Sequence, residues 1–163
     1  MPLLKNGEVV GDRWSLVPED ADEMPTGDIM VSLAQWEAHK VELCKRGGAF
    51  AIRLQPDEGP ELIAGDLKHF DVVALEFPAF TDGRAYSHAR LLRERYGYER
   101  EVRAVGDVLL EQLAFMQRAG FDAFDVDSKT PVEDWKVALA DFDVFYQPTG
   151  DGRETATQLR WRR

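Results

Sequence analysis

Short apolar runs alternate with helical patterns from residue 29 onward. The candidate strands are residues 29–33, 50–54, 71–77, 101–105, 123–126 and 144–146. Between them, apolar residues recur at helical spacing and stop at glycines, which predicts helices over 33–43, 86–96 and 108–116. Strand followed by helix, repeated at this length, is typical of a parallel sheet with crossover helices. We therefore predict an α/β fold with a mainly parallel sheet, as an open sheet or a partial barrel.

The two ends of the chain depart from this alternation. Asn6-Gly7 lies between apolar pairs and favours a type I′ turn, so a small hairpin is expected over residues 1–17. Residues 18–28 form an acidic linker, 29–148 the βα core and 149–163 a tail that ends in an edge strand or a frayed end. Further short helices are expected at 60–64 and after Thr130, with Thr130 as the cap and Pro131 at the first helical position.

Composition narrows the class of protein. The chain has 163 residues, 44% of them hydrophobic, which fits one globular domain. A formal net charge of −10 argues against a nucleic-acid partner and against a membrane surface. No apolar run has the length of a signal peptide or a membrane span, so we expect a cytoplasmic protein. The single cysteine, Cys44, cannot by itself ligate an iron–sulfur cluster, and we expect it in the core beside Leu43.

The loops that follow the third and fourth predicted strands carry the strongest candidate chemistry. In parallel α/β sheets, ligands bind beyond the carboxyl ends of the strands. In the first loop, Thr81 or Asp82 can cap the next helix, and Gly83 permits close backbone approach. In the second loop, Asp107 is the expected helix cap. The simplest interpretation is that Asp107 only caps and that Arg103 only pairs with a carboxylate.

The charge distribution favours a binding role for the same region. Residues 81–103 contain six arginines and four acids, so this window is +2 and the rest of the chain is −12. A guanidinium is a planar fork that binds oxyanions at two points. We therefore predict an oxyanion or acidic-partner site at the rim of the sheet, formed by Asp82, Gly83, Arg84, Tyr86, Ser87, Arg90, Arg103, Gly106 and Asp107.

Two structural alternatives compete with that prediction. Arg93, Glu94 and Arg95 are expected to face water on a solvated helix. Alternatively, the polar residues of the two loops form a buried network without any ligand, in which Asp82, Arg84, Ser87 and Asp107 take part.

Metal and nucleotide chemistry have weaker signals. Asp122, Asp125 and Asp127 surround the last strong strand and carry the oxygen ligands that Mg²⁺ prefers, but one of them is equally suited to a turn. The three histidines are far apart, and no glycine-rich dinucleotide or Walker motif is present. We expect no metal site.

The run Asp82-Gly83-Arg84-Ala85-Tyr86-Ser87, followed by Arg103-Ala104-Val105-Gly106-Asp107-Val108, resembles an uncharacterised bacterial family, domain-of-unknown-function family 934. Members of that family are encoded beside assimilatory sulfite reductase and are described as oxidoreductases of sulfite reduction. The resemblance implies a place in sulfur assimilation and brings no catalytic residues. Because six-electron reduction of sulfite needs metal and electron-carrying centres, a chain with one cysteine is better suited to an accessory role.

Two functions follow. The first is an accessory protein of assimilatory sulfate and sulfite reduction that binds a small oxyanion, sulfite reductase or another sulfur-assimilation protein. The second is an oxidoreductase with a borrowed flavin or other cofactor, in which Arg84 binds an anionic group and Asp107 or Tyr86 handles a proton.

Overall fold

The computed structural model of the protein describes residues 3–21, 24–126, 131–140, 145–146, 148–149 and 152–161. In these residues eight strands form one sheet: β1 (Leu3–Lys5), β2 (Glu8–Val10), β3 (Ser15–Leu16), β4 (Ile29–Ser32), β5 (Phe50–Leu54), β6 (Val72–Phe77), β7 (Glu101–Gly106) and β8 (Ala123–Asp125). The helical elements are α1 (Leu33–Leu43), η1 (Pro60–Ile63), η2 (Leu67–His69), α2 (Arg84–Arg90), η3 (Leu91–Arg95), η4 (Leu110–Gln112), α3 (Leu113–Ala119), α4 (Val132–Ala140) and α5 (Ala156–Arg160).

The α/β class is confirmed, but the sheet is mixed rather than mainly parallel. Its strand order is β2-β1-β8-β7-β6-β5-β4-β3, and the pairs from β3 to β8 are parallel. At the other edge β1 is antiparallel to both β2 and β8. The N-terminal hairpin joins the edge beside β8, and a hairpin brings antiparallel pairing with it. The hydrophobic periodicity of the sequence does not indicate which strand the hairpin pairs with.

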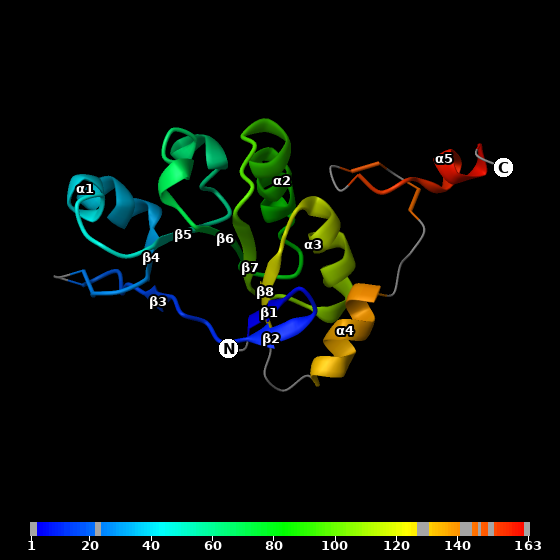
Figure 1. Ribbon diagram of the computed structural model, residues 1–163, viewed down its shortest axis with the longest axis horizontal. Coiled ribbons are helices and arrows are strands. Elements are labelled where there is room, and N and C mark those ends of the chain that lie inside the picture. Colours follow the sequence, from blue (N-terminus) through cyan, green and yellow to red (C-terminus); the bar gives the residue numbers. More distant parts are fainter. Residues whose placement is uncertain are drawn as a thin grey trace.

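The sheet is curled into a half-barrel, and the chain itself requires the curl. The edge strands β2 and β3 are connected by only residues 11–14. Five peptide steps reach at most about 18 Å, whereas eight strands laid flat span about 34 Å between the edge strands. The two edges must therefore bend toward each other. In Figure 1 the blue segment between β2 and β3 passes below the strands.

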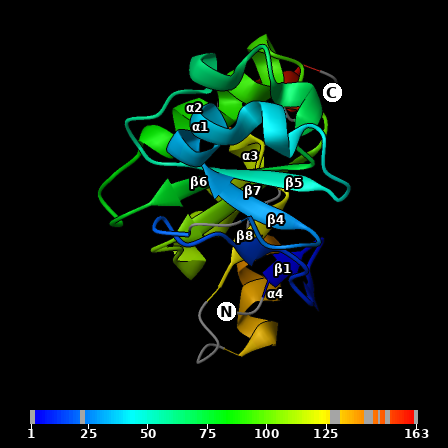
Figure 2. The ribbon, with the colours of Figure 1, turned by 90° about the vertical axis from the view of Figure 1, so that its left-hand side faces the viewer.

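The helices α1, α2 and α3 lie on one face of the sheet (Figure 2). Right-handed crossovers between strands taken in sequential order place every connecting helix on the same side. The main core fills the space between these helices and the sheet, with Trp36, Ile52, Leu75 and Leu92 fully buried in it. The opposite face is free of these helices and carries a smaller apolar cluster: Met30, Ala51, Val72, Ala74 and Val105, with Trp14 packed on it.

Several local predictions are confirmed. Asn6 and Gly7 both have positive φ, as a type I′ turn requires, and the hairpin spans β1 and β2. The helix predicted over 33–43 is α1, and the expected short helix at 60–64 is η1. The structure adds that Ser32 caps α1 through a capping box with Gln35. The helix after Thr130 is α4, but Thr130 itself lies outside the described residues.

Other local predictions are wrong. Residues 15–16 do not extend the hairpin but form β3 at the far edge of the sheet. The tail forms the short helix α5, which Thr155 caps, rather than an edge strand. Of the strand expected at 144–146, Phe145 makes an isolated bridge to Thr155, and Val144 lies outside the described residues. Cys44 is exposed at the end of α1, not in the core. No helix in the described ranges is long and apolar enough to span a membrane.

Candidate functional site

The first predicted loop places Arg84 at the rim, where the carboxyl ends of the strands lie. The Arg84 guanidinium donates to both oxygens of Asp82, at 3.0 Å and 2.7 Å, and Asp82 Oδ1 also accepts from the backbone N–H of Arg84. Those hydrogen bonds hold the pKa of Asp82 below its ordinary value. Gly83, not Asp82 or Thr81, occupies the N-cap position of α2. The Arg84 side chain is 56% exposed, so the pair is a surface ion pair.

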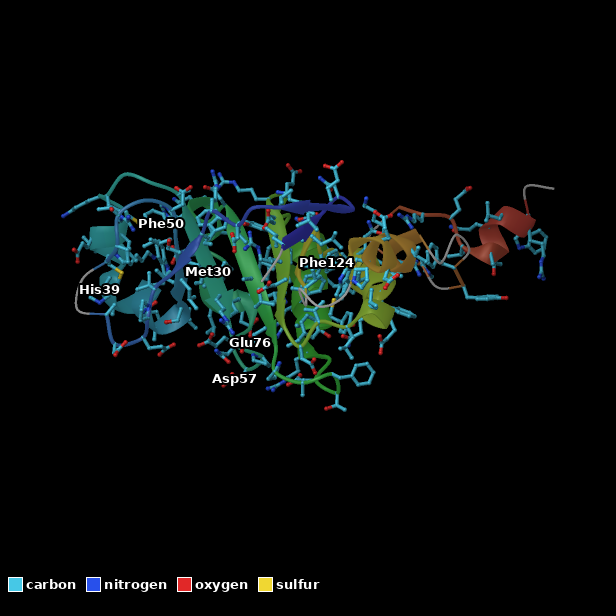
Figure 3. All side chains as sticks on the ribbon, turned by 90° about the horizontal axis from the view of Figure 1, so that it is seen from below. Met30, His39, Phe50, Asp57, Glu76 and Phe124 are labelled. Carbon is cyan, nitrogen blue, oxygen red and sulfur yellow. The ribbon has the colours of Figure 1, made fainter. Side chains whose placement is uncertain are left out.

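The charges around Arg84 are mainly acidic. Asp57 and Asp82 both act on its guanidinium. The neighbouring His88 has a pKa below its ordinary value, chiefly because it is partly buried, although Glu61 and Asp82 favour its charged form. In Figure 3, Asp57 and Glu76 lie at the same end of the sheet. This part of the rim therefore does not have the cationic character that the sequence window predicts.

The second predicted loop is tied to the first through its backbone. The N–H of Asp107 donates to the carbonyl of Phe77 at 2.7 Å, and the Asp107 carboxylate accepts from the N–H of Phe80 at 3.0 Å. Gly106 has φ +94°, and a Cβ there would lie 2.4 Å from the Phe77 carbonyl oxygen. Asp107 is thus not a helix cap, because the next helical element begins only at Leu110. Both residues fasten the two crossover turns together.

Arg103 does not lie at the rim, contrary to the prediction. It sits in the middle of β7, on the same face as Val105, which belongs to the apolar cluster on the helix-free face of the sheet. Its side chain is 3% exposed and pairs with Glu101 and Asp12. Arg84 pairs with Asp82 instead, so the two arginines take part in different ion pairs and share no partner. The alternative that Arg103 pairs with a carboxylate is confirmed.

The remaining predicted residues lie along α2. Ser87 is exposed, while Tyr86 packs edge-to-face on Phe77 and its pKa is raised by burial. Tyr86 and Arg90 line a hollow of about 350 Å³. Arg90 also lines a neighbouring pocket of about 300 Å³. We call these two adjoining hollows the α2–α3 groove, because their lining comes mainly from α2, η3 and α3.

The α2–α3 groove contains functional candidates that the sequence did not single out. Arg118, from α3, lines both hollows, donates to Thr149 Oγ1 at 3.3 Å and lies over the Phe145 ring at 3.9 Å. Phe115 is 64% exposed at the edge of the groove. Three arginines line the groove, Arg90, Arg93 and Arg118, against two carboxylates, Glu94 and Asp122. Residues 90–94 and 117–122 come together only in the folded chain, so no pattern in the sequence indicates the α2–α3 groove.

Arg93 and Arg90 differ in how fully their guanidiniums are hydrogen-bonded within the protein. Arg93 was expected to face water, but it donates to the carbonyls of Tyr98, Arg100 and Gly120 and pairs with Asp122. It is therefore a structural clamp. Arg90 pairs with Glu94, one helical turn on, and is 52% exposed. Among the described residues Arg90 Nη1 has no hydrogen-bond partner, so this guanidinium can turn toward a ligand.

The aspartates around β8 do not converge on a cation. The Asp122 carboxylate accepts hydrogen bonds from the Arg93 guanidinium and from the N–H of Val102. Asp125 is half-buried, and burial raises its pKa although Arg103 and Arg53 favour its charged form. Asp127 lies outside the described residues. In the described part of the chain, no three His, Cys, Asp or Glu side chains are placed to hold a metal ion.

A family comparison covers most of this architecture. Residues 51–157 match the model of a family of bacterial proteins of unknown function, DUF934. The chain belongs to the DUF934 family. The DUF934 match contains β5 to β8 and both sides of the α2–α3 groove, whereas residues 11–14 precede it. Comparison with curated proteins and with solved structures finds no match.

Proposed function

We propose that the protein is an accessory protein of assimilatory sulfate and sulfite reduction, which binds an acidic surface of a partner in the α2–α3 groove. The observation that carries the proposal is the composition of that groove. Arg90, Arg118 and Arg93 lie beside Tyr86 and the exposed Phe115, in a chain whose net charge is −10. Arginine and aromatic side chains are the residue types enriched at protein interfaces and at their hot spots.

The groove suits an anionic partner better than the rim does. Arg90 and Arg84 are comparably exposed and each is paired with a carboxylate. Arg84 is also influenced by Asp57, whereas Arg90 shares its hollows with two further guanidiniums. The Arg90–Glu94 pair lies on the surface, where such a pair is worth about 0.3–0.5 kcal/mol. Exchanging Glu94 for a carboxylate of the partner therefore costs little.

The place in sulfite reduction comes from the family resemblance. Its fit to this chain rests on chemistry: sulfite reduction uses metal and electron-carrying centres, and one cysteine cannot ligate an iron–sulfur cluster alone. The partner is then the reductase or another protein of the same route, and it supplies those centres.

Binding of purified sulfite reductase, measured by biolayer interferometry, tests the proposal with a matched pair of variants. Arg90→Glu reverses a charge in the groove, and Arg84→Glu reverses one at the rim. We expect Arg90→Glu to weaken binding about tenfold or more and Arg84→Glu to have little effect, because only the first removes a cation from the interface. Loss of binding in Arg84→Glu alone would move the site to the rim. No binding by the wild-type chain would refute the proposal.

A further inference from the structure

A short segment covers the helix-free face of the sheet. Residues 11–14, which we call the strap, run between the edge strands β2 and β3 (Figure 1). Trp14 packs on the apolar cluster of that face, while Gly11, Asp12 and Arg13 are exposed. No backbone–backbone hydrogen bond joins the strap to the rest of the described chain. Side chains alone hold it in place, so it can lift without breaking a strand.

Arg103 is the main anchor of the strap. Its Nε donates to Glu101 Oε1 at 2.9 Å, its Nη2 lies 2.8 Å from the same oxygen in an ion pair, and its Nη1 donates to Asp12 Oδ2 at 2.9 Å. Glu101 also accepts from Lys5 Nζ at 2.6 Å. Asp12 Oδ1 accepts from the N–H of Trp14 at 3.1 Å, which keeps the strap compact around this carboxylate.

The strap supplies one of the two negative charges that balance this hydrogen-bonded cluster. Lys5 and Arg103 are two cations, and Glu101 on β7 compensates one of them. Asp12 compensates the other, and it is 37% exposed, whereas the Arg103 side chain is 3% exposed. Without Asp12, the single carboxylate of Glu101 has to balance both Lys5 and the buried Arg103, which is costly. A monoanion that reaches Arg103 can therefore take the place of the Asp12 carboxylate without a net change in charge.

A hollow adjoins this cluster. It has a volume of about 140 Å³, and Lys5, Asp12, Arg13, Trp14 and Arg103 contribute to its lining. Arg13 pairs with Asp28 at 3.3 Å, lies over the Trp14 ring and is 64% exposed, so it adds a cation to the edge of the hollow. The space holds a small oxyanion but not a nucleotide or a peptide.

We propose that Arg103 is the centre of a small-oxyanion site and that the strap blocks it, with the Asp12 carboxylate standing in the position of the ligand. Because Nε and Nη2 face Glu101, the guanidinium offers an anion its Nη1, which makes a charge-assisted hydrogen bond to Asp12 Oδ2 in the closed state. The site lies on the opposite face of the sheet from the α2–α3 groove, and it does not depend on the function proposed for that groove. The anion and the Asp12 carboxylate compete for Arg103. The observed binding free energy of the anion is therefore reduced by the free energy of the Asp12 contact that it replaces.

Calorimetric titration of sulfite, sulfate and acetate at constant ionic strength tests this site. Asp12→Asn removes the competing charge, and Asp20→Asn makes the same change of charge at an exposed position outside the strap. If Asp12 occupies Arg103 nine-tenths of the time, its removal should raise the affinity for these anions about tenfold. We expect that gain in Asp12→Asn and no gain in Asp20→Asn. Equal affinities in the two variants would overturn the proposal.

A second measurement follows the strap in the wild-type chain and uses one conservative variant to assign the signal. An anion that displaces the strap exposes Trp14, so saturating sulfite should shift the tryptophan emission to longer wavelength. The shift should be lost in Trp14→Phe, which assigns the signal among the four tryptophans. A saturable shift that depends on Trp14 supports the site. The absence of any saturable shift contradicts it.

Discussion

Replacing Arg103 by alanine should destabilise the protein far more than replacing Arg84. Arg103 is 3% exposed, and its partner Glu101 is 10% exposed. In Arg103→Ala the Glu101 carboxylate stays buried with Lys5 as its remaining cation. Removing one partner of a buried ion pair costs about 3–5 kcal/mol. Because Lys5 stays in place, we expect the lower end, about 3 kcal/mol.

The corresponding loss in Arg84→Ala is small. Arg84 is 56% exposed and pairs with a neighbour two residues away, so it contributes about 0–1 kcal/mol. For a chain of this size, about 1 kcal/mol corresponds to about 2–4 °C in Tm. We therefore expect Tm to fall by about 6–12 °C in Arg103→Ala and by less than about 4 °C in Arg84→Ala.

Thermal unfolding followed by far-ultraviolet circular dichroism at pH 7.5 measures both variants. Arg103→Met combined with Glu101→Gln serves as the control, because it removes both charges and keeps the volume. That double variant should recover much of the stability lost in Arg103→Ala. Equal shifts of Tm in Arg84→Ala and Arg103→Ala would refute the assignment of Arg103 to a buried network.

Three further predictions concern protonation and backbone geometry. Burial raises the pKa of Asp125 above 3.8, so its ionisation penalises the native state as the pH rises from 3.8. Asp125→Asn should therefore raise Tm at pH 7.5, and this gain should vanish as the pH is lowered toward 3.8; an unchanged gain would contradict the burial. Burial lowers the pKa of His88 below 6.5, so stability should fall as the pH drops below 6.5, and the NMR titration midpoint of His88 should lie below that of a model peptide. Gly106→Ala, which forces a Cβ onto the Phe77 carbonyl, should lower the free energy of unfolding in urea by about 1–3 kcal/mol or more, whereas Gly65→Ala, with open space around it, should not.

The fold could be predicted from the sequence wherever local patterns decide the structure. The βα alternation gave β4 to β8 and the helices between them, and the Asn6-Gly7 turn gave the hairpin. The docking of that hairpin beside β8, which makes the sheet mixed, depends on contacts more than 100 residues apart. The helix in the tail could not be predicted, because α5 buries none of its residues and its sequence therefore has no apolar face of helical period.

The candidate site was predictable only in part. Two residues of the predicted site, Arg90 and Tyr86, line the α2–α3 groove. The sequence predicts that Arg103 lies in a strand, but it indicates neither the face of the sheet on which the side chain lies nor its partner. Asp12, 91 residues away, is brought to Arg103 by the curl of the sheet, and no spacing in the chain indicates that contact.

Hydrogen exchange of the protein with and without sulfite reductase tests the central claim most directly. If the partner occupies the α2–α3 groove, amide exchange should slow in α2, η3 and α3 when the complex forms, while the rim loop at residues 78–83 should exchange as before. Protection confined to that rim loop, or no protection in any of these elements, would contradict the account.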